Sequence, residues 1–279
     1  MAYSSGARIN TNIAAYNALN ALNNANRQLG IHQLRLATGK RINSAGDDPS
    51  GYVISKKLEG RSQALSAALQ NVGDANSVFS VAEGGYQTIN DILVQIKAEQ
   101  TRAANGAMGT DELTAIADEI NQQMTEIDDT NDQTKFNGNV LMKKDAAATA
   151  FNATFQIGEA ATETLGVTFS QTTGATALLG VAAGSVTAAN IASLTVDTGI
   201  QTVSGALGSI GAMESRLSDK ETNLNTAITN TDAAQSQIMD ADVAKEQIDV
   251  VKDQFLQQTA TAQLAQANQT PSVFLSLFR

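Results

Sequence analysis

The stretch Gly39–Gly51 combines glycines, a basic pair and adjacent carboxylates, so it is a place where a ligand could be bound. A phosphate-binding loop needs a glycine five residues before the glycine of a Gly-Lys pair and a hydroxyl after the pair. Leu34 and Arg41 stand at those two positions instead. A calcium loop needs carboxylates at alternating positions, whereas Asp47 and Asp48 are adjacent. Neither a phosphate site nor a calcium site is predicted here.

Asp48 and Pro49 are instead typical of a helix start. An aspartate at the N-cap accepts hydrogen bonds from the free amides of the first turn. A proline at the first helical position has no N–H to lose. We therefore predict a helix that begins at Pro49 and is capped by Asp48.

The rest of the sequence offers little material for catalysis or for binding cofactors. It has no cysteine, which excludes thiolate zinc sites. Its single histidine, His32, excludes motifs with two histidines and leaves little material for a Ser-His-Asp triad. Carboxylates also pair at Asp128 and Asp129 and at Asp240 and Asp242, but on charged helix faces, where solvated surface is the usual role. We predict no enzyme activity, no catalytic residue, no cofactor and no metal, and we expect His32 at a surface or interface of a helix.

The hydrophobic pattern of the sequence predicts long helices, and these helices must position the residues named above. Apolar residues spaced by three or four predict a first amphipathic helix over residues 9–39. Large apolar residues then recur every seven positions over residues 54–103 and again over 196–238, as in coiled coils. Gly84 and Gly85 lie inside the first heptad region without shifting its phase, so we interpret them as points of close helix contact.

Shorter elements lie between and after these helices. A shorter amphipathic helix is predicted over residues 111–128. Alternating apolar residues over 151–157 and 165–169, separated by a polar turn, predict a β-hairpin. The apolar face resumes after Asp240, and we expect Pro271 to stop or kink the last helix. Residues 171–193 are compatible with a loop, a short strand or a helical turn.

These elements predict a mainly α fold, a long antiparallel coiled coil or helix bundle formed by the N- and C-terminal halves with a small central β-hairpin region. The middle helices can form a self-sufficient bundle, whereas residues 9–39 and 240–279 supply one helix each. Ordering a chain costs about 1–2 kcal/mol of backbone entropy per residue. We therefore expect both end segments to be poorly ordered in an isolated chain and to be buried against other copies.

Charge and hydropathy exclude two classes of partner. The formal net charge of −10 argues against a general nucleic-acid binder. No run of 18 apolar residues is present, so no membrane span is expected. The first eight residues are polar, and the pattern after them is interrupted by asparagines, so no cleaved secretory signal is predicted.

Several segments, in their order and spacing, resemble bacterial flagellin. The similarity covers roughly residues 1–141 and 196–279. The segments that carry it are Ile9–Asn12, Gly39–Ala45 with Asp47 and Asp48, Gln133–Gly138, Leu264–Gln269 and Leu275–Arg279. The resemblance implies a structural subunit that polymerises into the flagellar filament for motility. The alternative is a hook-filament junction (hook-associated) protein, which is similar at both ends of the chain.

The resemblance also implies a domain arrangement. Residues 1–47 and 239–279 would form an inner terminal coiled-coil domain, and residues 48–238 an outer helical bundle, with its hairpin at about residues 140–195. Few residues remain for large further outer domains. The residues expected to carry subunit packing are Ile9, Ile13, Tyr16, Leu19, Leu22, Leu29, Leu65, Val72, Phe79, Tyr86, Leu93, Val203, Ile210, Leu217, Leu224, Ile238, Ile248, Val251, Phe255, Leu264 and Leu277.

The partners that the resemblance implies are further copies in a helical homopolymer, the flagellar cap and hook-associated proteins, and a cytoplasmic export chaperone on the C-terminal segment. It implies an extracellular location, reached through type III export without a cleaved signal peptide. Vertebrate Toll-like receptors recognise a segment of some flagellins, and here Gln95 and Glu99 replace an arginine and a leucine of that pattern, while Glu119 matches. We therefore expect weak receptor recognition.

Overall fold

The computed structural model describes residues 11–276 except 146 and 148. The chain divides into two compact units, one of Met1–Gly60 with Asn230–Arg279 and the other of Arg61–Thr229. Both boundaries fall inside long helices, α2 (Pro49–Ala103) and α5 (Val196–Met239). The first boundary lies 13 residues after the expected position 47/48 (60 − 47), and the second lies 9 residues before the expected position 238/239 (238 − 229).

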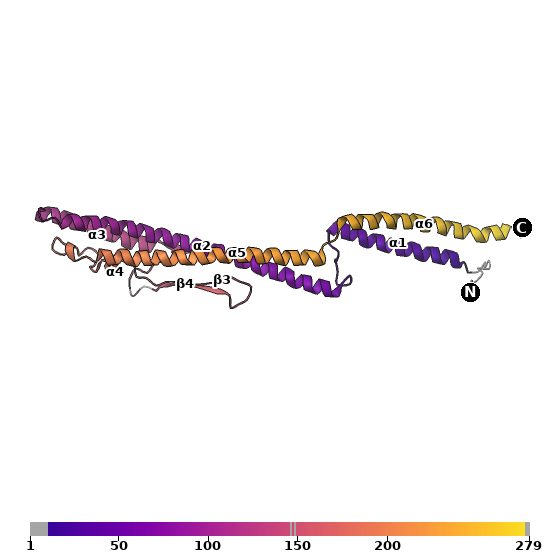
Figure 1. Cartoon of the computed structure of the whole chain (residues 1–279), viewed down its shortest axis with the longest axis horizontal. Coiled ribbons are helices and arrows are strands. Elements are labelled where there is room, and N and C mark those ends of the chain that lie inside the picture. Colours follow the sequence, from indigo (N-terminus) through magenta and orange to yellow (C-terminus); the bar gives the residue numbers. More distant parts are fainter. Residues whose placement is uncertain (1–10, 146, 148, 277–279) are drawn as a thin grey trace. The chain divides into compact units, whose positions relative to one another are not determined.

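The first unit pairs the helices from the two ends of the chain. Helix α1 (Ile13–Thr38) and helix α6 (Val243–Ser276) lie side by side and antiparallel, as Figure 1 shows. Asn12 caps α1 by accepting a 3.0 Å hydrogen bond from Ala15 N, and Gly39 ends it in the left-handed conformation with φ 67°. Both ends of α1 thus follow the usual capping rules.

The charged stretch after α1 forms a turn and a helix cap. Asp47 Oδ2 accepts hydrogen bonds from the backbone amides of Ser44 and Asn43, which lower the pKa of the Asp47 carboxyl. Asp48 Oδ1 accepts a 3.0 Å hydrogen bond from Gly51 N, and α2 begins at Pro49. The stretch therefore places its carboxylates on backbone amides of its own chain.

A short backbone pairing ties this turn to the end of α5. Arg41 N donates to Met239 O at 2.6 Å, and Ala241 N donates to Gly39 O at 2.9 Å. The Arg41 side chain also donates to Ile238 O at 2.7 Å. Ile42, next to this pairing, is only 1% exposed. The turn between α1 and α2 is thus joined to the turn between α5 and α6, both within the first unit.

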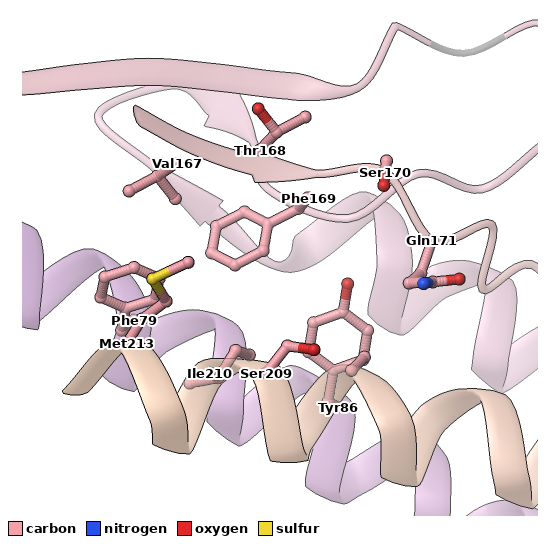
Figure 2. Close-up of a pocket in the computed structure, with 11 residues that line it drawn as sticks. Phe79, Tyr86, Val167, Thr168, Phe169, Ser170, Gln171, Ser209, Ile210 and Met213 are labelled. Carbon is pink, nitrogen blue, oxygen red and sulfur yellow. The ribbon is translucent and has the colours of Figure 1, made fainter. Parts of the chain in front are cut away.

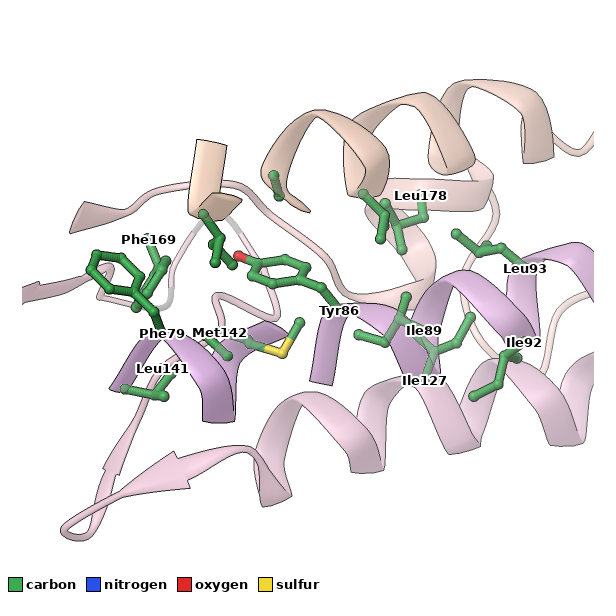
Figure 3. Packing of buried hydrophobic residues seen from close by; sticks show 14 of the residues in the cluster. Phe79, Tyr86, Ile89, Ile92, Leu93, Ile127, Leu141, Met142, Phe169 and Leu178 are labelled. Atoms are coloured by element: carbon green, nitrogen blue, oxygen red, sulfur yellow. The ribbon is translucent and has the colours of Figure 1, made fainter. Parts of the chain in front are cut away.

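The second unit is a helix bundle whose core follows the heptad pattern. Its helices are α2, α5 and the shorter α3 (Thr110–Gln133), whose inward face includes Ile120, Met124 and Ile127. The buried apolar heptad residues of α2 and α5 include Leu65, Val72, Phe79, Tyr86, Leu93, Val196, Val203, Ile210, Leu217 and Leu224. The second seam of α2, which includes Ala68, Ala75, Ala82, Ile89 and Ile96, is buried as well. Figure 3 shows part of this packing.

Two antiparallel hairpins follow α3. The first joins β1 (Lys135–Phe136) to β2 (Asn139–Val140), and its turn residues Asn137 and Gly138 have φ of 48° and 82°. Positive φ at both central residues is the geometry that matches the twist of paired strands. The second joins β3 (Phe151–Gln156) to β4 (Thr164–Phe169), with Phe151 opposite Phe169. This second hairpin confirms the alternation seen in the sequence.

The second hairpin covers the helix bundle with one face of β4. Leu165, Val167 and Phe169 are buried, and the intervening residues are exposed. The rings of Phe79 and Phe169 meet edge to face with centroids 5.8 Å apart. Figure 3 places both rings at one end of the core view, beside Leu141.

Residues 171–193 contain helical turns, α4 (Ala175–Leu179) and the 3-10 turn Ile191–Ser193. Side chains of α3 hold this segment in place. Asn131 Nδ2 donates to Thr173 O at 2.9 Å and Asn131 Oδ1 accepts from the Thr173 hydroxyl, both residues being fully buried. Asn121 likewise pairs with both backbone groups of Val186. Leu178, Leu179 and Ile191 of the segment also lie in the core, at spacings that follow no regular repeat, so polar contacts and separate apolar contacts fix its course together.

Helix α6 continues through Pro271 to Ser276. Of the two outcomes expected for this proline, a stop and a kink, the stop is wrong. Proline removes one backbone donor and crowds the preceding turn, but a helix can continue when the neighbouring turns keep their own hydrogen bonds.

Candidate subunit interface

The end helices expose their largest apolar side chains. Tyr16, Ile248 and Phe255 are 63%, 69% and 65% exposed, although equally large residues of the second unit are buried almost completely. The other exposed large apolar residues of α1 and α6 are Ile13, Leu19, Ile31, Leu34, Val243, Val251 and Leu256. We call these residues, with Tyr16, Ile248 and Phe255, the exposed apolar surface of the end helices. Exposed apolar surface on this scale is typical of a surface that binds another protein.

The surface stays exposed because the seam between α1 and α6 fully buries mostly small and polar residues, while Leu22, Leu29 and Leu264 are only half-buried. Ala18, Ala25 and Ala260 are among its buried members. Hydrophobic stabilisation grows by roughly 25 cal/mol per Å² of buried apolar area, and alanine contributes little area. Polar side chains join the helices as well, for example Asn12 Nδ2, which donates to Ala267 O at 2.7 Å.

The predicted packing residues that the structure describes fall into three groups by location. Those of the second unit pack within the core of their own chain: Leu65, Val72, Phe79, Tyr86, Leu93, Val203, Ile210, Leu217 and Leu224. Those that belong to the exposed apolar surface are Ile13, Tyr16, Leu19, Ile248, Val251 and Phe255. Those that are half-buried are Leu22, Leu29, Ile238 and Leu264. Ile9 and Leu277 lie outside the described residues.

Four members of the exposed apolar surface were not among the predicted packing residues, namely Ile31, Leu34, Val243 and Leu256. The spacing of three and four residues marks one stripe per helix, which suits a helix with one buried face. Here apolar residues occupy more than one face of each end helix. The width of the apolar arc on each end helix is the sequence signal that could have revealed them.

A cavity of about 130 Å³ lies in the second unit between α2, α5 and β4. Figure 2 shows Tyr86 and Phe169 facing it from opposite sides. Its lining includes no acidic, basic or histidine side chain. Burial raises the pKa of Tyr86 to about 12, so this hydroxyl stays protonated at neutral pH. The cavity therefore lacks the paired acid and base that general acid–base chemistry requires.

No described helix combines the length and the apolar character needed to cross a membrane.

Comparison with known proteins identifies the family. The N-terminal helical region of bacterial flagellin matches residues 9–147, and the C-terminal helical region of bacterial flagellin matches residues 194–278. The flagellin of Bacillus subtilis (strain 168) is 36% identical, with 98% of this chain and 100% of that protein covered. The flagellar filament 33 kDa core protein of Treponema phagedenis is 34% identical, with 97% and 99% covered.

A solved structure shares the fold. A putative flagellar hook-associated protein from Vibrio parahaemolyticus superposes with a TM-score of 0.56 at 14% identity, over 70% of this chain and 100% of that one. At this identity the likeness concerns the fold alone. The full-length similarity to flagellins decides the family, and the chain therefore belongs to the bacterial flagellins, the structural subunits of the flagellar filament.

Proposed function

We propose that this filament subunit polymerises through the exposed apolar surface of α1 and α6. The observation that carries the proposal is the contrast between the two units: the aromatic residues Phe79 and Tyr86 of the second unit are buried, whereas Tyr16, Ile248 and Phe255 of the end helices are exposed. A side chain such as Phe255 contributes roughly 1.5–3 kcal/mol when it moves from water into a packed interface. Contacts between unlike surfaces that do not close into a ring generate a helical polymer.

The proposal includes the domain roles. Residues 1–47 and 239–279 form the inner part of the filament, and residues 48–238 the outer bundle. Three observations support this: the end helices pair with each other, their seam is thin, and the second unit has a complete core of its own. A unit with a complete core does not need a partner, whereas a thinly packed helix pair gains most from one.

Substitution of two exposed residues on α6 tests the proposal. The double variant Ile248→Ser and Phe255→Ser should raise the critical concentration for filament growth by more than about tenfold, from the apolar area each residue contributes. The fold of the isolated chain should survive, because both side chains are exposed in it. Growth on filament seeds is followed by light scattering and electron microscopy.

Val140→Ser is the matched control, since Val140 is exposed at 39% but lies on the β1–β2 hairpin of the second unit. It should polymerise like the unmodified chain. Filaments formed by the double variant at the unmodified critical concentration would contradict the proposal, as would micrometre-long filaments from a chain that lacks both end helices.

The remaining partners are proposed on the same surface. We propose that a cytoplasmic export chaperone covers the C-terminal segment around Phe255, and that the cap and hook-associated proteins contact the same end helices in the assembled flagellum. Exposure of Val251, Phe255 and Leu256 supports the chaperone, because such a surface needs a cover before assembly. We also propose an extracellular location reached without a cleaved signal peptide, and no catalytic activity.

Weak recognition by Toll-like receptors belongs to the same proposal. Gln95 is exposed on α2, and Glu99 forms an ion pair with Arg102. Arg102 also approaches Glu119 at 3.6 Å. Position 99 therefore carries a largely buried carboxylate paired with Arg102, where a leucine would offer an apolar contact.

The junction role is not favoured. The relatives that cover the whole chain are named flagellin and flagellar filament core protein. The hook-associated structure resembles this chain only in its fold.

A further inference from the structure

A polar cluster interrupts the seam between α1 and α6 within the first unit. His32 of α1 contacts Glu246 of α6 through Nδ1, and its Nε2 lies 3.8 Å from Asp253 Oδ2. The carboxylates of Glu246 and Asp253 are each about nine-tenths buried. Asp249 lies between them, one turn of α6 after Glu246. Buried carboxylates are costly unless a cation or hydrogen-bond donors compensate for the lost hydration.

The described residues compensate for this charge only in part. Arg35 Nη1 approaches Glu246 Oε1 at 3.5 Å, so one cation faces three carboxylates. Within the described part of the chain, nothing donates a hydrogen bond to Asp253 Oδ2, although this atom is buried. With Glu246, Asp249 and Asp253 ionised and His32 neutral, the cluster carries an excess of two negative charges. A divalent cation would balance that excess.

The geometry provides a set of ligands for such a cation. A ring nitrogen of His32 and carboxylate oxygens of Glu246 and Asp249 lie within 4.8 Å of one another. Zinc binds nitrogen and oxygen ligands at about 2.0–2.2 Å, so three ligand atoms this close to one another can share one ion once their side chains adjust. We propose that His32, Glu246 and Asp249 bind a divalent transition-metal ion, of the zinc type, that joins α1 to α6.

Asp253 has a defined role in this site. A histidine that binds metal through one nitrogen usually donates the N–H of its other nitrogen to a carboxylate, which fixes the ring. With Nδ1 on the metal, Nε2–H points to Asp253 Oδ2, the buried atom that otherwise has no donor. The unsatisfied carboxylate and the ligand cluster are thus two separate observations that support the same site.

The ligand types select among metals. Imidazole nitrogen favours zinc, nickel and copper, whereas magnesium and calcium prefer sites made of oxygen alone. Three protein ligands leave one position of a tetrahedral zinc ion for water or for a group from a neighbouring copy. One histidine and scattered carboxylates form no spacing motif, so this site differs from the expectation from the sequence, which was no metal.

The single histidine makes the test direct, because every imidazole signal belongs to His32. Nitrogen-15 NMR of the imidazole is recorded on the full chain while ZnCl₂ is added, in solution for the monomer and in the solid state for the polymer. Zinc should shift the Nδ1 resonance with saturation at one equivalent, while Nε2 stays protonated. Magnesium at the same concentration should shift neither nitrogen.

Substitutions then separate this site from general surface binding. Asp249→Asn removes a ligand and Asp253→Asn removes the carboxylate behind the imidazole, and each should weaken zinc binding at least about tenfold. Glu221→Gln, at an exposed carboxylate of α5, removes the same charge far along the sequence and should leave binding unchanged.

Two results would overturn the site. One is an Nδ1 resonance that does not respond to zinc in either state of the protein. The other is an equal response in the Asp249→Asn variant, which would indicate adventitious binding. Both results are independent of filament growth, so failure of the metal site and failure of the proposed polymerisation surface can be told apart.

Discussion

At the scale of single residues, Tyr86 links burial to pH. Its ring is 1% exposed, and burial raises its pKa to about 12 from the value near 10 of an exposed tyrosine. The folded state therefore holds the phenolic proton more tightly than the unfolded state does. This stabilisation is complete below about pH 10 and is lost as the pH rises through about 12.

The variant Tyr86→Phe should therefore lose less stability than the unmodified chain between about pH 10 and 12. A shift of about two pKa units corresponds to roughly 3 kcal/mol in the free energy of unfolding. Urea unfolding at a series of pH values, followed by circular dichroism, measures the difference. Tyr16→Phe, at an exposed tyrosine, is the control. Equal alkaline destabilisation of the Tyr86→Phe variant and the unmodified chain would refute this account.

At the scale of elements, two adjacent glycines of α2 have different roles. A Cβ atom at Gly85 would lie 2.6 Å from Thr134 Oγ1 and 2.8 Å from Met142 Sδ, whereas a Cβ atom at Gly84 would meet nothing within 4 Å. Gly85 is therefore a point of close contact between α2 and the segment after α3. Gly84 is not, so the sequence interpretation is confirmed at one position and wrong at the other.

The pair gives a matched prediction for the second unit. Gly85→Ala should reduce the free energy of unfolding by about 1–3 kcal/mol, because Thr134 and Met142 are both buried and must shift. Gly84→Ala should increase it by up to about 1 kcal/mol, because alanine favours a helix over glycine. Thermal or urea unfolding of both variants measures the difference. Equal effects at the two positions would contradict the contact at Gly85.

At the scale of the whole chain, the two units differ in how much apolar surface they bury. The second unit encloses a continuous apolar core, whereas α1 and α6 bury mainly alanines and polar groups and leave their leucines, as far as Leu264, half-buried or exposed. Regions with few buried apolar contacts open at low free energy. In the isolated chain, amides of α1 and α6 should therefore exchange hydrogen faster than those of the second unit.

Polymerisation should reverse this order for the end helices. Hydrogen exchange followed by mass spectrometry, on the monomer and on filaments, should show protection of α1 and α6 only in filaments, with little change in the buried face of α2. End helices as protected as α2 in the monomer would show that they need no partner. Such a result would also remove the reason for assigning them to contacts between copies.

The sequence by itself determined the elements whose residues repeat at regular intervals. The heptads placed α2 and α5, the alternation placed β3 and β4, and the Asp48–Pro49 pair marked the start of α2. Such patterns are local, because helices and strands present residues to a buried face at fixed spacing. The motifs that resemble flagellin indicated the family because they too are local stretches of sequence, found in the same order along the chain.

Tertiary structure alone decided what depends on residues far apart in the sequence. Asn131 fixes Thr173, and Gly85 admits Thr134, through contacts that no local spacing encodes. His32 meets Glu246 only because α1 and α6 pair antiparallel, so a histidine without any motif around it lies among buried carboxylates. The charge and the burial around His32 depend on α1 and α6 together. The sequence pattern of either helix alone therefore does not predict them.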